Sequence, residues 1–491
     1  MHIPLITILI TILSALIIPF FKEKKVAMGL TICSFSLVFL LSIFLGFYLY
    51  SSNTGYFTYQ LGGISAPFTN ELRSGVFESI MAGALSLVML LSILGGNKSI
   101  NKDIDKSKQR YFYLILNLLL GSILALIFTN DIFTAYVFIE INAIAACGIV
   151  VIKKSKDTLK ATIKYFVMSI LGSGVFLFSI STLYSITGYL SMSFMKEAIG
   201  VLPIEYLTPL RTSFVLLSVG LFVKSALFPF HTWLPDAHGS STPSASAILS
   251  GVVLKGYIIL YIKIIYRVFG IDVIKELNVL PLILVLGLLG MIMGSVFAMT
   301  QQDLKKMIAY SSVAQIGYIY LGIGLGTEMG LLAASFHILV HGFTKSMLFI
   351  SAGNFLEIGN TKKIEELDGL GRVDLVSGIM FTLGGLSMIG IPLLSGFVSK
   401  LLFINGALDN RFMVVVLVAL AFSTLLNGMY YVPVIMRLFN KGDGKRELNL
   451  NFVSSGVGKY ALICLGVINI LLGIFFQPVF QGIINGISNL G

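Results

Sequence analysis

The sequence predicts an all-α polytopic membrane protein with about fourteen transmembrane helices. Of its 491 residues, 56% are hydrophobic and only 12% are charged, and the mean hydropathy is +0.93. A soluble domain carries about 25% charged residues. Apolar stretches of roughly 18 residues or more recur along the chain without the alternation of a membrane barrel, so each is a candidate spanning helix. We expect spans at 3–21, 26–50, 75–95, 111–128, 131–152, 161–188, 209–230, 243–269, 279–299, 307–326, 329–357, 375–403, 412–436 and 458–485.

The placement of lysine and arginine supports this number of spans. The net charge is +11, and most basic residues lie in the loops after odd-numbered spans, the loop after span seven excepted. Such loops face the cytoplasm, so the charge reflects membrane orientation and predicts no nucleic-acid partner. We therefore expect a prokaryotic cytoplasmic (inner) membrane location with both termini on the outer side. Residues 1–4 lack a basic signal-peptide region, so we expect the first span to be retained.

Two spans contain helix breakers beside a lysine. In span seven Lys224 precedes Pro229, and in span twelve Pro392 precedes Lys400. Proline removes an amide donor, and interrupted helices in corresponding positions of a transporter indicate an internal repeat around the transport path. Kinks that only fit helix packing are the alternative. An odd number of spans per unit makes the two copies inverted. We predict N-terminal helices 1–3 at 1–110, a first inverted repeat at 111–270, a second at 271–440 and C-terminal helix 14 at 441–491.

Five ionisable side chains lie deep within apolar spans. They are Glu140, Lys224, Lys255, Lys345 and Lys400. A charge at the bilayer centre costs at least ~2.5–3.5 kcal/mol, and such residues usually mark an ion or proton path. Glu140 needs a cationic neighbour to remain ionised, and Lys224 and Lys255 are its natural partners. A static Glu–Lys pair that holds two helices together is the structural alternative.

Span eleven carries three titratable groups on one helix face. His337, His341 and Lys345 are spaced four residues apart, which stacks them along the helix. This pattern favours a proton relay over a metal site, because no third ligand lies close by. The three cysteines fall inside spans, where we expect packing residues. We therefore predict no metal, no cofactor and no catalytic redox centre in this chain.

Four further residues are secondary candidates. His231 and His238 flank the only tryptophan in the loop between spans seven and eight, where they could admit protons from the cytoplasm. Hydroxyl residues at 240–244, with a proline among them, are typical of a helix N-cap. Lys263 lies nearer the end of span eight and is expected to snorkel to the interface. Glu78 begins span three and has no assigned role.

One segment resembles a known signature. The run from Lys224 to His238, Lys-Ser-Ala-Leu-Phe-Pro-Phe-His-Thr-Trp-Leu-Pro-Asp-Ala-His, resembles the antiporter-like subunits of respiratory complex I, of Mrp-type multisubunit cation/proton antiporters and of membrane-bound hydrogenase-type complexes. Glu140, the three groups of span eleven and the segment 301–312 support the resemblance, which covers roughly spans three to thirteen.

The resemblance implies two inverted five-helix repeats around a hydrophilic axis at mid-membrane. Its key positions fall on Glu140, Lys224, Lys255 and Lys400, with the His-His-Lys face of span eleven bridging the halves. Lysine at position 400 and the end of the chain soon after span fourteen look most like the D-type subunit of an Mrp antiporter or its hydrogenase counterpart.

These observations predict a proton-translocating subunit of a multisubunit membrane complex. Its expected partners are other membrane subunits and the lipid bilayer, and the ions moved are protons, with Na⁺ as a second candidate. A stand-alone secondary transporter of a small solute or cation is the alternative, although the sequence offers no further polar pocket for one. A redox enzyme lacks support, because there is neither a cofactor motif nor a cysteine cluster.

Overall fold

The computed structural model describes residues 2–52, 55–442 and 448–491 and is almost entirely helical. In these ranges twelve helices are long and apolar enough to cross a membrane. They are α1 with the turn η1 (Ile3–Phe20), α2 (Lys24–Ser51), α3 (Val76–Gly95), α5 (Gln109–Phe128), α6 (Ile132–Val151), α7 (Lys156–Thr187), η3 with α9 (Ile204–Ser225), the run α11–η4–α12–η5 (Pro243–Phe269), α14 (Leu280–Met299), α16 (Glu328–Gly359), α20 (Met413–Phe439) and α21 (Gly456–Ile474).

The other two predicted spans are also helical but fall outside that group. Span ten is α15 (Leu304–Gly324), a continuous helix whose lysines, serines and glutamine make it less apolar than its neighbours. Span twelve is divided into α18 (Leu375–Ile389) and α19 (Ser395–Leu408), each shorter than a full crossing. Residues 390–394 between them are not helical. Hydropathy therefore locates all fourteen segments, while length and apolar character single out twelve.

Two sequence expectations are wrong in detail. The last span, predicted at 458–485, ends at Ile474, and a separate helix α22 (Gln477–Ser488) follows with Pro478 in its first turn. Proline favours a helix start over a helix interior, which accounts for the break. The predicted loop at 51–74 contains an antiparallel hairpin of β1 (Tyr56–Gln60) and β2 (Glu71–Gly75), so the all-α class includes one small sheet.

Helix ends follow their capping residues. The Thr242 hydroxyl accepts the amide of Ala245 at the start of α11 (Pro243–Ile248), which confirms the N-cap predicted at 240–244. At the start of α16 the Thr327 hydroxyl accepts the amide of Gly330 in the same way. These caps fix the starting points of the two most buried spans.

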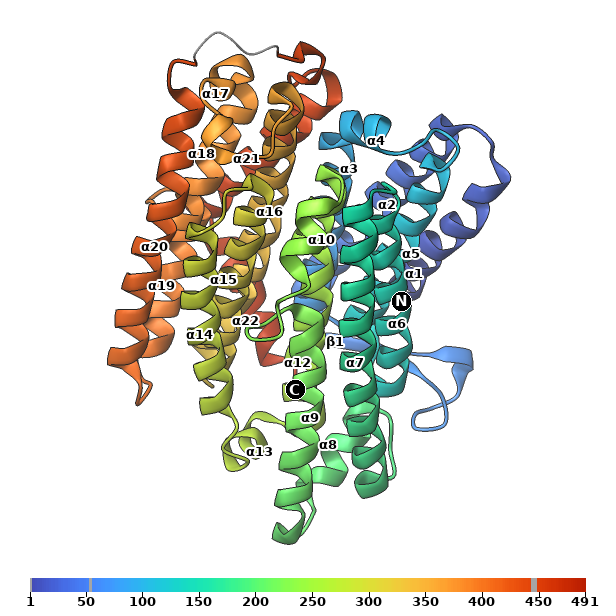
Figure 1. The fold of residues 1–491 in the computed structure, drawn as a ribbon. Helices are drawn as coiled ribbons and strands as arrows, with labels where there is room; N and C mark the ends of the chain where they lie inside the picture. The colour runs from blue at the N-terminus through green and yellow to red at the C-terminus, as the bar shows by residue number, and fades with distance from the viewer. Residues whose placement is uncertain (1, 53–54, 443–447) are drawn as a thin grey trace.

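The helices are arranged so that α16 and the run Pro243–Phe269 lie inside protein, and the apolar window of each span is completely buried. In Figure 1 the chain passes from α1–α7 on the right, through α9 and α12 in the centre, to α14–α20 on the left. α16 packs against α3, α15, α18, α19 and α21. The ionisable groups of these two spans are therefore shielded from lipid.

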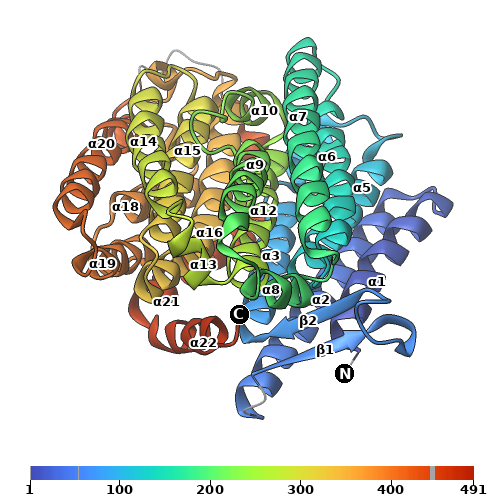
Figure 2. The same ribbon diagram turned by 90° about the horizontal axis from the view of Figure 1, so that it is seen from below.

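Short elements collect at the two ends of the bundle. The helix α8 and the terminal helix α22 lie at the same end as the hairpin, which faces the viewer in Figure 2. By chain order, the basic loops after odd-numbered spans lie at the opposite end. The short helices are α4 (Asn97–Asp103), α8 (Met192–Gly200), α10 (Leu234–Ser240), α13 (Ile271–Glu276) and α17 (Leu370–Val373).

Candidate functional site

Glu140 and Lys224 lie side by side within the first half of the chain. Glu140 is on α6, and Lys224 is the next-to-last residue of α9 (Leu207–Ser225). The Lys224 Nζ lies 3.6 Å from Glu140 Oε1 and donates to the Ser169 hydroxyl of α7 at 2.6 Å. The lysine side chain is 1% exposed and the glutamate side chain 31%, although the glutamate Oε1 itself is buried. Of the two predicted partners, Lys224 therefore forms an ion pair with Glu140, whereas among the described residues Lys255 does not.

The end of α9 explains how a lysine is held at this depth. The helix stops at Ser225 because Ala226 adopts a left-handed conformation with φ 56°. The Trp233 indole donates to the carbonyl of Val223 at 3.0 Å, and its ring stacks on Tyr165 at 4.1 Å. Lys224 therefore sits beside the carbonyl end of a helix, where the helix dipole favours a cation.

Lys255 on α12 (Leu254–Ile264) is held by a wide helical turn. Its Nζ donates to the carbonyl of Ser250, which belongs to the π-helical turn η4 (Leu249–Val253). A π turn disturbs the regular carbonyl ladder, and such turns are frequent at functional sites. The Ser250 hydroxyl lies 2.9 Å from that of Ser312 on α15. This serine pair links span eight to the second half of the chain.

Lys345 on α16 meets the same helix α15. Its Nζ donates to the Ser311 hydroxyl, to the carbonyl of Ile308 at 3.0 Å and to the Tyr431 hydroxyl at 3.3 Å. Because Ser311 and Ser312 are adjacent in sequence, one turn of α15 contacts the surroundings of both central lysines. Sequence analysis assigned neither serine a role.

His337 and His341 stack along α16 and face the protein interior. Their rings are nearly parallel, with centroids 6.1 Å apart. The His337 Nδ1 lies 2.6 Å from the Ser399 hydroxyl of α19. Among the described residues, the Nε2 of His337 and both ring nitrogens of His341 have no hydrogen-bond partner. Three ring nitrogens are thus free for water or for proton exchange.

Lys400 on α19 lies beside the interruption of span twelve. Its Nζ donates to the carbonyl of Ile389, the last residue of α18, at 2.6 Å and to the Thr424 hydroxyl of α20 at 2.8 Å. The ring of Tyr318 is 5.6 Å from this Nζ and 5.7 Å from the His337 ring. Tyr318 therefore lies between Lys400 and the histidines, a position that sequence reasoning missed.

The two loop histidines are both buried, in different surroundings. His231 is stacked between Phe228 and Phe297, and burial lowers the pKa of its imidazole. His238 is stacked on Phe349 at 5.0 Å, and burial together with nearby lysines holds its pKa well below the ordinary range. Both imidazoles are therefore neutral near pH 7.

Lys263 corrects one expectation. We expected it to snorkel, but its side chain is fully buried. Its Nζ donates to the carbonyls of Leu126, Ile127 and Thr129 at 3.0, 2.7 and 2.5 Å. These carbonyls close α5, so Lys263 caps a helix end.

Glu78 forms a buried ion pair with Arg267 of η5 (Ile265–Phe269). The Glu78 Oε1 lies 2.5 Å from Arg267 Nη2, and Oε2 accepts the amide of Gly75 at 2.8 Å. The Arg267 Nε donates to the carbonyl of Leu490 at 2.9 Å. Glu78 thus ties α3 to span eight, and Arg267 ties span eight to the segment after α22.

The many apolar helices define a polytopic membrane protein, and several Glu, Lys and His side chains lie inside its helix bundle. Residues 129–426 match the family described as NADH:quinone oxidoreductase/Mrp antiporter, TM. The matched segment is more than half of the chain, and the chain belongs to this family. The resemblance noted in the sequence is therefore confirmed.

Relatives from two kinds of complex are similar over most of their length. The chain is 30% identical over 444 residues to the D-type subunit of the Na(+)/H(+) antiporter of Alkalihalophilus pseudofirmus, covering 90% of this chain and 87% of that one. It is also 30% identical over 393 residues to the N-type subunit of the NADH-quinone oxidoreductase of Desulforudis audaxviator, covering 77% and 76%.

Two solved structures share the fold. A chain of the archaeal membrane-bound sulfane sulfur reductase, a respiratory membrane complex, superposes with a TM-score of 0.91 at 26% identity, covering 100% of this chain and 98% of the other. A chain of the Mrp complex from a Dietzia species superposes with a TM-score of 0.89 at 19% identity, covering 100% and 97%, and shows the fold alone.

Proposed function

We propose that this chain is a proton-translocating antiporter-like subunit of a multisubunit membrane complex, either the D-type subunit of an Mrp antiporter or its counterpart in a hydrogenase- or complex I-like machine. One observation carries the proposal: ionisable side chains lie inside spans of both halves, and those of α12 and α16 lie in the two spans whose apolar windows are completely buried. The proposed proton path consists of Glu140, Lys224, Lys255, Lys345, His341, His337 and Lys400.

The first step of the path is a coupled charge change. A proton on Lys224 supports the ionised form of Glu140 at 3.6 Å, and loss of that proton leaves the carboxylate without its cation. A membrane potential acts on such a step with ~2.3 kcal/mol per charge per 100 mV. Serine hydroxyls beside Lys224, Lys255 and Lys345 can rotate to donate or accept, so they supply short links to intervening water.

The exposure of Glu140 supports a partner subunit. On the same face of α6, Phe133 is 45% exposed and Ile144 is 63% exposed, so the Glu140 side chain is partly open on the outside of this chain although its Oε1 is buried. A carboxylate facing lipid at this depth is costly. We propose that another membrane subunit covers this opening, and that the basic loops face the cytoplasm of a prokaryotic cell, which places both termini outside.

The test is Lys224→Ala in the assembled complex. We expect proton transport to be lost while assembly persists, because the lysine meets only one carboxylate and one hydroxyl. Transport is measured as dye-reported acidification of membrane vesicles, normalised to complex content. Lys164→Ala is the matched control, since Lys164 is an exposed lysine on α7 that pairs with Asp236. Wild-type transport by Lys224→Ala would remove this residue from the path.

A further inference from the structure

Gln315 carries a buried amide to which the sequence gave no role. It lies midway along α15, and its side chain is 1% exposed. Among the described residues, neither its Oε1 nor its Nε2 has a hydrogen-bond partner. A side-chain amide has two donor hydrogens and an acceptor oxygen, and leaving them unpaired inside a protein costs stability. Buried polar atoms without a protein partner are the usual sites of internal water.

Gln315 lies on the face of α15 that packs against α16. Successive residues of an α-helix turn by about 100°, so Ser311, Tyr318 and Gly322 all lie within about 60° of Gln315 around the helix axis. Each of these three residues meets α16. The contacts are the hydrogen bond from Lys345 to Ser311, the ring pair of Tyr318 and His337 with centroids 5.7 Å apart, and Gly322, where an added Cβ would lie 3.1 Å from that of Ala334. The side of α15 that carries Gln315 therefore faces α16 both before and after this residue.

The same contacts give the register of the two helices, which are joined by the short segment 325–327 and run antiparallel. Gln315 follows Ser311 by four residues, and His341 precedes Lys345 by four residues. Both steps are ~6 Å in the same direction at ~1.5 Å per residue. The contact at Tyr318 agrees with this register to within one residue. Gln315 therefore lies opposite His341, at the same level of the bundle.

His341 presents unpaired atoms toward the same place. Its side chain is completely buried, and among the described residues neither ring nitrogen has a hydrogen-bond partner. The amide of Gln315 and the imidazole of His341 thus face each other without a direct hydrogen bond. A water molecule that bonds to both side chains satisfies a polar atom on each of them.

We propose that Gln315 is a positioning residue that holds an internal water against the ring of His341, at the step between Lys345 and His337. The Nε2 of Gln315 donates to the water oxygen, and the water donates to the ring nitrogen of His341 that carries no proton. A proton that arrives on the water oxygen is matched by one that leaves to this nitrogen, so the water is restored. Gln315 itself carries no proton. The inference rests on the proposed function and adds a group that does not titrate to its path.

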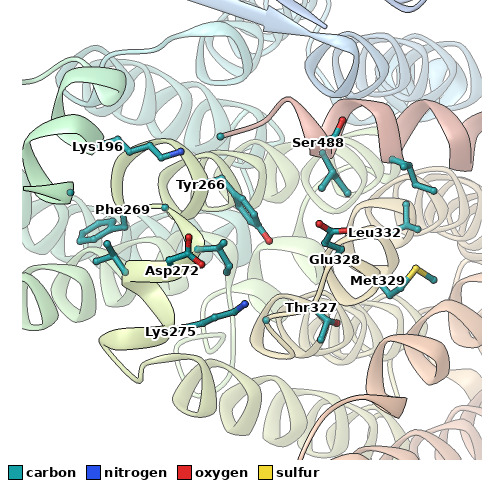
Figure 3. Close-up of a pocket in the computed structure, with 18 residues that line it drawn as sticks. Lys196, Tyr266, Phe269, Asp272, Lys275, Thr327, Glu328, Met329, Leu332 and Ser488 are labelled. Atoms are coloured by element: carbon teal, nitrogen blue, oxygen red, sulfur yellow. The ribbon is translucent and has the colours of Figure 1, made fainter.

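The site is separate from the pocket of about 770 Å³ at the end of the molecule that carries α8, α13 and α22 (Figure 3). On α16 the pocket is lined by Glu328, Met329 and Leu332. Leu332 precedes His341 by nine residues, which is ~13.5 Å along the axis and about 180° around it. Leu332 and His341 therefore project from opposite sides of α16, and changes to the pocket should leave the Gln315 site intact.

Gln315→Met in the assembled complex tests the role of the amide. Methionine fills a similar volume but does not hold a water as an amide does. We expect proton transport, measured as dye-reported acidification of vesicles and normalised to complex content, to fall at least about tenfold. Gln315→Asn keeps the amide and should stay within about threefold of wild type. Ile316→Met is the matched control with expected wild-type transport, because Ile316 is buried on the same helix but is turned by about 100° from Gln315.

A density map of the complex that resolves water provides a second readout, which needs no transport. We expect a water between the Gln315 amide and the His341 ring in wild type and none there in Gln315→Met. Wild-type transport by Gln315→Met, equal slowing by Gln315→Met and Gln315→Asn, or a direct Gln315–His341 contact without water overturns the proposal. The Glu140→Gln variant separates the two claims: if it transports normally the proposed function fails, whereas the density at Gln315 does not depend on it.

Discussion

Replacing Glu140 in two ways should produce a graded loss of transport. At 3.6 Å and an effective dielectric constant of ~20, the attraction between Glu140 and Lys224 is about 4–5 kcal/mol. Glu140→Gln removes all of this energy while keeping the shape. Glu140→Asp shortens the side chain, and at ~5 Å the same expression gives about 3.3 kcal/mol, a loss of roughly 1.3 kcal/mol.

These energies translate into rates through the occupancy of protonated Lys224. A difference of ~1.4 kcal/mol is tenfold in an equilibrium constant and so at most tenfold in the fraction of protonated Lys224, and we expect Glu140→Asp to transport up to about tenfold more slowly. Partial exposure of the Glu140 side chain reduces the full value, so we expect Glu140→Gln to lose at least about a hundredfold. Initial rates of acidification in inverted vesicles, normalised to assembled complex, measure both. Wild-type rates with Glu140→Gln would refute the electrostatic argument.

Three further predictions concern other parts of the path. Lys400→Ala should abolish transport, whereas Lys400→Glu should retain part of it because it keeps an ionisable group beside Thr424. A fully active Lys400→Ala variant would contradict a relay through both halves. Tyr318→Leu should slow proton transport without loss of assembly. Tyr318→Phe keeps the ring between Lys400 and His337 and should slow transport less. Equal transport rates in both variants and wild type would exclude a role for the ring. Lys263→Met should lower the thermal unfolding midpoint of the complex, because three buried carbonyls lose their hydrogen-bond donor. Each unsatisfied carbonyl costs roughly 1–3 kcal/mol of stability before the surrounding structure relaxes. An unchanged midpoint would argue against the capping role.

The positions of the helices could be predicted from the sequence because hydropathy and loop charge are strong signals in membrane proteins. The division of 458–485 into α21 and α22 was missed although Pro478 marks it, because the apolar composition continues across the break. The hairpin was missed because its strands have five residues each, too few for a clear alternation.

The site was predictable where a charge enters an apolar span. The desolvation cost predicted a lysine partner for Glu140 and left Lys224 and Lys255 as candidates, and the structure pairs it with Lys224. Ser250 and Ser311 were not predictable, because a serine inside a helix commonly bonds to the carbonyl four residues earlier and gives no sign of a neighbour. The prediction that Lys263 reaches the membrane interface was wrong because it used only the distance of Lys263 from the end of its span. The free carbonyls at the end of α5, which Lys263 binds, cannot be recognised from that distance.

The complete burial of the apolar windows of α16 and of Pro243–Phe269 means that Lys255, Lys345 and the two histidines of α16 are separated from lipid by other helices of the same chain. Lipid composition should therefore have little direct influence on proton steps between Lys255 and His337. Glu140 is different, because nearly a third of its side chain opens on the outer surface of the chain. In an isolated chain this glutamate would contact lipid, so under the proposed function its ionisation should depend on assembly with a neighbouring subunit.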